Sequence, residues 1–157
     1  MVIHEMSREE CQAVLARASM GRLGCSLDNQ PYVVPVYFAY EQDYIYVLST
    51  FGQKIKWMRA NPKVCVEIEE APTQPEWVTV IANGSYQELV EPQYSTERAH
   101  ARKLLEKRHR WWLNAMAERR AKSTDDWIEP LFFRIKIDSV TGLRARAESE
   151  EAAAGPR

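Results

Sequence analysis

The spacing of apolar residues predicts an N-terminal helix followed by strands. Ser7-Arg8-Glu9-Glu10 has the form of a capping box, and apolar side chains then recur with helical spacing at Cys11, Val14, Leu15 and Ala18. Gly21 is expected to end this helix in a left-handed conformation. Runs rich in β-branched and aromatic residues, separated by polar turns, predict three strands, at 22–26, 31–40 and 44–48.

The second of these strands is apolar at both of its alternating sets of positions. The two sets are Val34, Val36 and Phe38, and Val33, Tyr37 and Ala39. Such a strand needs cover on both faces, so we expect a barrel interior on one side and a helix, a ligand or a second subunit on the other. Pro35 cannot donate a hydrogen bond to a neighbouring strand, which predicts a break or a sheet edge there.

The rest of the chain predicts two further helices and three further strands. A short helix at 54–60 should stop at Asn61-Pro62, and a basic helix should run from Thr96 to Lys122. Strands are expected around 64–68, at 77–86 with a bulge at Gly84, and around 133–137. We expect 71–76 to be a loop and Thr141-Gly142 a turn. Together these elements predict a mainly β (α+β) domain over 1–144, built as a small, closed or partly closed six-stranded antiparallel barrel, with a disordered tail at 145–157.

Composition places the chain among ordinary globular proteins. It has 157 residues, 45% of them apolar and 27% charged, and a formal net charge of −1. No apolar run approaches the roughly 18 residues of a membrane helix, and the first ten residues are polar, so we expect a cytoplasmic protein without membrane association. The widely spaced cysteines indicate reduced thiols rather than a disulfide framework or zinc site. The three histidines, His4, His100 and His109, do not have metal-ligand spacing, and no metal is expected.

The segment Ser49-Thr50-Phe51-Gly52-Gln53-Lys54 offers the most chemistry. Two hydroxyl groups follow a strand, and a lysine lies at the start of a helix, where free N–H groups and the helix dipole favour an anion. These groups together suit one phosphate. The alternative is that Thr50 only caps the helix and Lys54 is solvated; the residues by themselves do not separate the two interpretations.

The order of elements around this segment resembles the pyridoxamine 5′-phosphate oxidase-like family. The likeness rests on the strand, Ser-Thr-x-Gly-Gln-Lys turn, short helix and Asn-Pro stop over 44–64, and covers about 6–143. It is supported by Gly21-Arg22-Leu23-Gly24, Pro35-Val36-Tyr37-Phe38 and Trp77-Val78-Thr79-Val80 before Gly84. The nearest branch is that of small uncharacterised flavoproteins which includes nitroimidazole-resistance proteins.

This resemblance implies a split β-barrel that forms a homodimer with two FMN sites at its interface. Ser49, Thr50, Gln53 and Lys54 would then hold the flavin phosphate, and the backbone of Pro35, Val36 and Tyr37 would run along the isoalloxazine ring. Thr79, near Trp77, would contribute from the neighbouring chain. Gln53 replaces the arginine that precedes the lysine in the oxidase itself, which argues against oxidation of pyridoxamine phosphate.

The expected function is therefore that of an FMN-dependent oxidoreductase acting on a small molecule. The alternatives are a flavin or haem carrier or sensor, and a reductase that uses the deazaflavin F420. The basic helix with Trp111-Trp112 could also bind nucleic acid. We favour a helix whose apolar side packs on the barrel while its charges are solvated, and whose tryptophans could line a pocket.

Overall fold

One antiparallel sheet forms the centre of the fold. The structure is a computed structural model, and it describes residues 1–73, 75–108 and 130–147. In these residues the sheet contains eight strands: β1 (Val2–Glu5), β2 (Met20–Leu27), β3 (Gln30–Tyr37), β4 (Ala39–Glu41), β5 (Tyr44–Ser49), β6 (Lys63–Thr73), β7 (Glu76–Glu88) and β8 (Leu131–Arg146). Their order is β3-β2-β6-β7-β8-β5-β4, with β1 added to β8.

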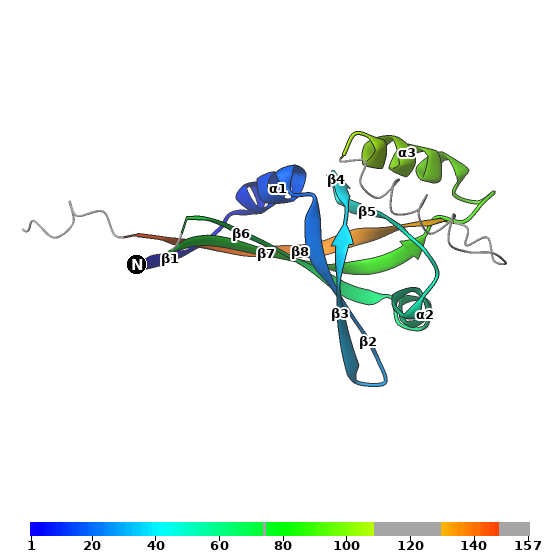
Figure 1. The fold of residues 1–157 in the computed structure, drawn as a ribbon, viewed down its shortest axis with the longest axis horizontal. Helices are drawn as coiled ribbons and strands as arrows, with labels where there is room; N and C mark the ends of the chain where they lie inside the picture. The colour runs from blue at the N-terminus through cyan, green and yellow to red at the C-terminus, as the bar shows by residue number, and fades with distance from the viewer. Residues whose placement is uncertain (74, 109–129, 148–157) are drawn as a thin grey trace, which may run out of the picture.

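The first and last strands of this order, β3 and β4, follow each other in the chain with a single residue between them. Phe38, which is buried, separates β3 from β4, and its backbone N–H donates to the carbonyl oxygen of Ser19 at 3.0 Å. Figure 1 shows the β2–β3 hairpin projecting from the long ribbon of β6, β7 and β8. The mainly β, antiparallel character of the sequence prediction is confirmed. Closure of the sheet into a barrel stays a prediction.

In the described part of the chain, three helices pack on the sheet: α1 (Arg8–Arg17), α2 (Gln53–Ala60) and α3 (Ser95–Glu106). In Figure 1, α1 and α3 lie above the ribbon and α2 lies near the base of the β2–β3 hairpin. The predicted capping box begins α1. The Ser7 hydroxyl accepts from the Glu10 amide at 3.2 Å, and the Glu10 carboxylate accepts from the Ser7 amide at 2.8 Å. The bond from the Ser7 amide is the main reason that the pKa of Glu10 is lowered.

Ser7→Ala is expected to lower the free energy of unfolding by about 1 kcal/mol, because it leaves the Glu10 amide without its capping acceptor. Urea denaturation followed by circular dichroism measures the change. Glu9→Gln is the matched control in the same helical turn, outside the capping box, and should cost less. An equal loss in both variants would show that first-turn charge, rather than the cap, stabilises α1.

The sequence prediction was wrong about where several elements begin and end. The predicted six strands are eight in the described residues, because β1 was missed and the predicted strand at 31–40 divides into β3 and β4 at Phe38. Gly21 does not end α1: the cap is Ala18, and Gly21 lies within β2 with a negative φ. The predicted loop at 71–76 is largely strand, since β6 reaches Thr73 and β7 starts at Glu76.

The C-terminal boundary also differs from the prediction. The expected turn at Thr141-Gly142 is the middle of β8, where these residues pair with Ile81 and Val80 of β7. Ala145, predicted to begin a disordered tail, is 1% exposed and pairs with Ile3 of β1 and with Trp77. The ordered region therefore extends beyond 144, and residues 148–157 of the predicted tail lie outside the described residues.

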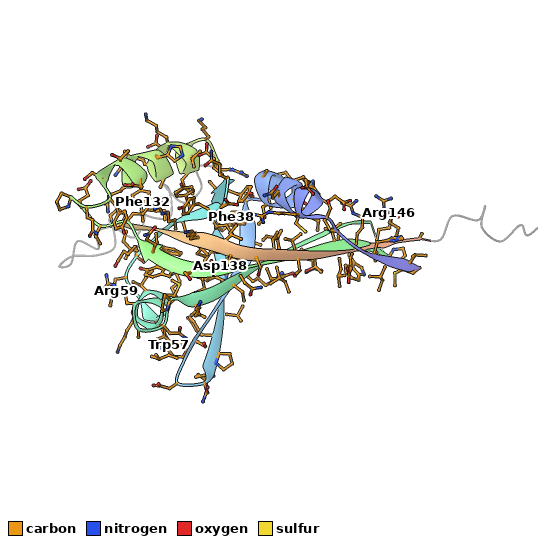
Figure 2. All side chains as sticks on the ribbon, turned by 180° about the vertical axis from the view of Figure 1, so that it is seen from behind. Phe38, Trp57, Arg59, Phe132, Asp138 and Arg146 are labelled. Atoms are coloured by element: carbon orange, nitrogen blue, oxygen red, sulfur yellow. The ribbon has the colours of Figure 1, made fainter. Side chains whose placement is uncertain are left out.

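The buried apolar residues form two clusters. The larger one fills the space between α1, α2 and the sheet, and includes Phe38, Ile45, Ile55 and Phe133. The smaller one lies under α3 and consists of Ala39, Tyr46, Leu89, Ala101, Leu105 and Phe132. Figure 2 shows Phe132 between α3 and the sheet. Together the clusters fix the position of β5, whose two faces contact different clusters: Ile45 and Val47 lie in the larger one and Tyr46 in the smaller one.

Two of the basic side chains of α3 pack against the sheet. The guanidinium groups of Arg98 and Arg102 lie 5.0 and 5.5 Å from the centroid of the Phe132 ring, where cation–π attraction holds α3 against the sheet. The rest of the predicted basic helix, including Trp111-Trp112, lies outside the described residues. None of the described helices is long and apolar enough to span a bilayer.

Candidate functional site

The turn between β5 and α2 is built without help from a capping side chain. Gly52 is the N-cap residue of α2, its backbone is extended, and no side-chain hydrogen bond caps the helix. Thr50 is therefore not the N-cap residue that the alternative interpretation expected. Ile55 and Met58 are fully buried and anchor α2 in the core. The first turn of a helix presents backbone N–H groups that have no partner within the helix, and these N–H groups favour an anion.

Five of the predicted site residues line one pocket of about 150 Å³: Pro35, Val36, Tyr37, Ser49 and Lys54. The segments 35–37 and 49–54 come from different parts of the sequence, and β3 and β5 bring them together. In the sequence, only the family resemblance links these two segments. In the structure, both segments line the same pocket.

The other lining residues make the pocket apolar away from the turn. Val47, Leu48 and Leu105 complete the wall. Val36, Val47 and Leu105 are 5%, 2% and 4% exposed, so they present packed apolar surface. Leu105 was not among the predicted site residues, because its contribution depends on how α3 docks. The result is a slot with largely apolar walls, which has the Ser49 hydroxyl and the Lys54 ammonium group at its end next to the turn, and the phenol of Tyr37 on the β3 wall.

Charge in this region comes from Lys54. Burial raises the pKa of the nearby Cys25 thiol, as does the proximity of Cys65, while the positive charge of Lys54 acts in the opposite direction. Ser49 donates from its hydroxyl to the Thr50 carbonyl oxygen at 3.1 Å, which fixes the hydroxyl at the start of the turn. An ammonium group beside apolar walls attracts an anion more strongly than it would in open water.

Strand β3 supplies one wall and is also the edge of the sheet. It pairs only with β2 in the strand order, with Pro35 opposite Arg22, so the predicted position of Pro35 at an edge is confirmed. Val36 points into the core, whereas Val33 and Tyr37 are 63% and 41% exposed. The outer face of β3 is therefore apolar and open in the single chain, next to the pocket.

The remaining predicted site residues lie elsewhere. Thr50 and Gln53 belong to the turn but do not line the pocket. Thr79 lines a second pocket of about 350 Å³ formed by β1, β7 and β8, and its hydroxyl donates to the Glu67 carboxylate at 3.3 Å. Trp77 pairs with Ala145 on the same ribbon. The expectation for Thr79 and Trp77 concerns a neighbouring chain, so their role stays a prediction.

Neither of the two described histidines lines the pocket. His100, on α3, contacts the Glu41 carboxylate through Nε2 and meets the Tyr46 ring edge-on with the ring centroids 5.8 Å apart. His4 lies in β1, and His109 is outside the described residues. Among the described residues, no group of three or more His, Cys, Asp or Glu side chains is arranged to hold a metal ion.

Comparison with known proteins shows which family the chain resembles. The family model described as pyridoxamine 5′-phosphate oxidase matches residues 7–144. An uncharacterised protein of Rhizobium meliloti (strain 1021) is 40% identical over 148 residues, which are 94% of this chain and 98% of that protein.

Solved structures agree. An FAD-binding protein from Mesorhizobium loti is 38% identical, with a TM-score of 0.76, and the match covers 94% of this chain and 99% of that one. A proposed 5-nitroimidazole antibiotic resistance protein from Bacteroides thetaiotaomicron shares the fold at 18% identity and a TM-score of 0.63, over 92% of this chain and 89% of that one. The span of the family match, the identity to these relatives and the strand–turn–helix pocket lead to one conclusion: the chain belongs to the pyridoxamine 5′-phosphate oxidase-like family.

Proposed function

We propose that the chain is a flavoprotein which holds the FMN moiety of its cofactor in the pocket between β3, β5 and the start of α2. The observation that carries this proposal is the convergence of Pro35–Tyr37 with Ser49 and Lys54 on one apolar slot that has a cation at its end. The relative from Mesorhizobium loti is described as FAD-binding, and FAD contains the FMN moiety. The pocket chemistry fits the planar, largely apolar ring and the anionic phosphate of that moiety.

Each part of the pocket has a distinct task in this proposal. The Lys54 ammonium group and the Ser49 hydroxyl bind the phosphate, the hydroxyl exchanging its bond to the Thr50 carbonyl oxygen for one to the ligand, with Thr50 and Gln53 completing the turn around it. The backbone of Pro35–Tyr37, at a sheet edge with hydrogen-bonding groups not all used by β2, lies along the ring. Val47, Leu48 and Leu105 exclude water from the other side.

A second copy of the chain completes the site. The pocket of about 150 Å³ is smaller than the roughly 300–1,000 Å³ typical of sites that enclose a ligand. The apolar outer face of β3 lies beside it, with Val33 63% exposed. A homodimer that covers this face both buries it and closes the pocket, and it can bring in Thr79 and Trp77 from the partner.

Val33→Lys is expected to convert the dimer to a monomer and to weaken flavin binding, because an unpaired ammonium group buried at the interface costs several kcal/mol. Light scattering after size-exclusion chromatography gives the mass, and titration with FMN gives the affinity. Val90→Lys is the matched control, since Val90 is also exposed, at 43%, but lies outside β3. A dimer that survives Val33→Lys contradicts the assignment of this face.

The reaction we propose is oxidoreduction of a small molecule with electrons from a reduced nicotinamide. A bound flavin supplies the hydride or electron transfer, and the protein supplies binding, orientation and electrostatics. Among its own residues, Lys54 holds the phosphate and β3 orients the ring, so neither side chain needs to act as a strong acid or base. The family to which the chain belongs includes oxidoreductases, which is consistent with this role.

The visible absorption spectrum of the purified protein tests the proposal. Bands of oxidised flavin, either as purified or after loading with FMN, are the expected result, and bleaching on addition of NADH or NADPH under anaerobic conditions supports the enzymatic role. A flavin that stays oxidised with both reductants supports a carrier instead. A Soret band or a deazaflavin spectrum favours haem or F420. A colourless protein that cannot be loaded with FMN overturns the assignment.

A further inference from the structure

The turn of the proposed flavin site carries an exposed aromatic ring that the proposed function does not use. Phe51 lies between Ser49 and Lys54, and its side chain is 59% exposed. The guanidinium group of Arg59 lies 5.3 Å from the centroid of its ring. Among the described residues, Phe51 therefore has the Arg59 guanidinium group against its ring, and more than half of its side chain is exposed.

Arg59 is itself held in place, so the ring has a fixed support. Its Nε and Nη2 atoms donate to the two carboxylate oxygens of Glu88 at 3.1 and 2.7 Å. This two-bond geometry fixes the plane of the guanidinium group. The Glu88 side chain, on β7, is only 17% exposed, which anchors the pair to the sheet. We call Phe51 and Arg59 together the Phe51–Arg59 shelf.

The shelf and the pocket lie on different flanks of α2. Successive helical residues are rotated by about 100°, so Lys54 and Arg59 are separated by about 140° around the axis. The buried residues Ile55 and Met58 occupy the face between them. Figure 2 shows Arg59 and Trp57 on different sides of the helix. Because that face is packed in the core, a ligand that reaches from the pocket to the shelf must pass around the N-terminal end of α2, where the turn places its phosphate.

The charge of the turn fits a phosphate with one negative charge better than one with two. Lys54 is the cation in 49–54, and Ser49, Thr50 and Gln53 are neutral. A terminal phosphate monoester carries about −1.5 to −2 charges at pH 7. A pyrophosphate bridge has about the same total charge, but it divides that charge between two phosphates with one ionisable oxygen each, so the phosphate next to Lys54 carries a single charge. FMN ends in a monoester, whereas FAD continues through a pyrophosphate to an adenosine.

We propose that the Phe51–Arg59 shelf stacks on the adenine ring of FAD, and that the dinucleotide is therefore bound more tightly than FMN. This inference rests on the proposed flavin site. Adenine has a flat π face that an exposed phenyl ring can cover, and Arg59 fixes the orientation of that ring. The shelf adds affinity only for a ligand that reaches beyond the first phosphate.

Titration of the cofactor-free protein with FAD and, separately, with FMN tests the inference, with calorimetry or flavin fluorescence as the readout. Phe51→Ala should weaken FAD binding by roughly 5- to 150-fold, the range for loss of one aromatic stack on a base, and change FMN binding by less than about twofold. Phe51→Leu, which keeps an apolar side chain but removes the π face, should behave like the alanine variant. Phe51→Trp, which keeps an aromatic face, should bind FAD about as tightly as the wild-type protein does.

The outcomes separate this inference from the function on which it depends. If the wild-type protein binds neither flavin, the proposed function itself fails. If it binds both flavins and Phe51→Ala leaves the ratio of the two affinities unchanged, the flavin site stands and the shelf is overturned. An equal loss for both flavins together with a change from dimer to monomer also overturns the shelf, since it assigns Phe51 to the subunit interface.

Discussion

Gly84→Ala is expected to lower the free energy of unfolding by about 3 kcal/mol, the upper part of the range for overpacked positions. An added Cβ at residue 84 would lie 2.2 Å from the carbonyl oxygen of Lys136 and 2.9 Å from Cγ2 of Ile135. The first of these atoms belongs to the backbone of the neighbouring strand and cannot move without disturbing the pairing of β7 with β8. The pairing register shifts between Asn83 and Gly84, so the close approach occurs at a bulge.

Urea denaturation of the two proteins measures this difference. Gly24→Ala is the matched control, because Gly24 is also a sheet glycine and its added Cβ would also meet an atom at 2.9 Å. That atom is the Cys65 sulfur, at the end of a side chain that can rotate away, so we expect a loss of less than about 1 kcal/mol. Similar losses of stability in the two variants would contradict this prediction, since they would show that the backbone at Gly84 makes room for a Cβ as readily as the Cys65 side chain does.

Local chemistry explains which elements could be predicted from the sequence. The capping box at Ser7 and Glu10 and the helix stop at Asn61 each depend on residues close in sequence, and both are confirmed. The pairing irregularity expected at Gly84 is present, but the extra residue is Asp138 on the neighbouring strand β8. One of the polar turns expected between the first strands is confirmed too, at Asp28-Asn29, with φ angles of 50° and 63° that these residue types tolerate.

The errors all involve strands whose place is set by a distant partner. β1 has four exposed residues and forms because β8 offers an edge for it. Thr141-Gly142 has the composition of a turn, yet these residues continue β8, since β7 pairs with them along its length. Gly21 follows a helix, as a C-terminal glycine would, but an added Cβ there would meet the Glu67 carbonyl oxygen at 2.9 Å. Its role is to let β2 and β6 approach closely.

The residues of the candidate site also fall into two groups: those that the local sequence indicates and those that depend on distant contacts. Ser49 and Lys54 belong to a strand–turn–helix segment that is visible within a few residues of sequence, and they do line the pocket. Leu105 enters the wall only through the docking of α3, which no local pattern specifies. Thr79 would need the position of a second chain. Residues such as Leu105 and Thr79 thus require tertiary or quaternary information, whereas the turn proposed to bind the phosphate does not.

Lys54→Ala is expected to weaken FMN binding by roughly 1–3 kcal/mol, about 5- to 150-fold, because it removes a charged hydrogen-bond donor from the phosphate. Lys54 lies at the polar end of a pocket whose other walls are largely apolar, so water replaces the lost contact poorly. Calorimetric titration of the cofactor-free protein measures the affinity. Lys56→Ala is the matched control: it removes the same charge from an exposed position of α2 and should leave binding nearly unchanged.

Riboflavin, which lacks the phosphate, identifies the part of the ligand that Lys54 contacts. The wild-type protein should prefer FMN to riboflavin, and the alanine variant should lose much of that preference because its affinity for riboflavin is unaltered. An equal loss for both ligands would assign Lys54 to the ring or to the shape of the pocket. Lys54→Arg keeps the charge and should retain part of the preference. Raising the salt concentration should weaken FMN binding more in the wild type than in Lys54→Ala, since screening acts on the charge that the variant lacks.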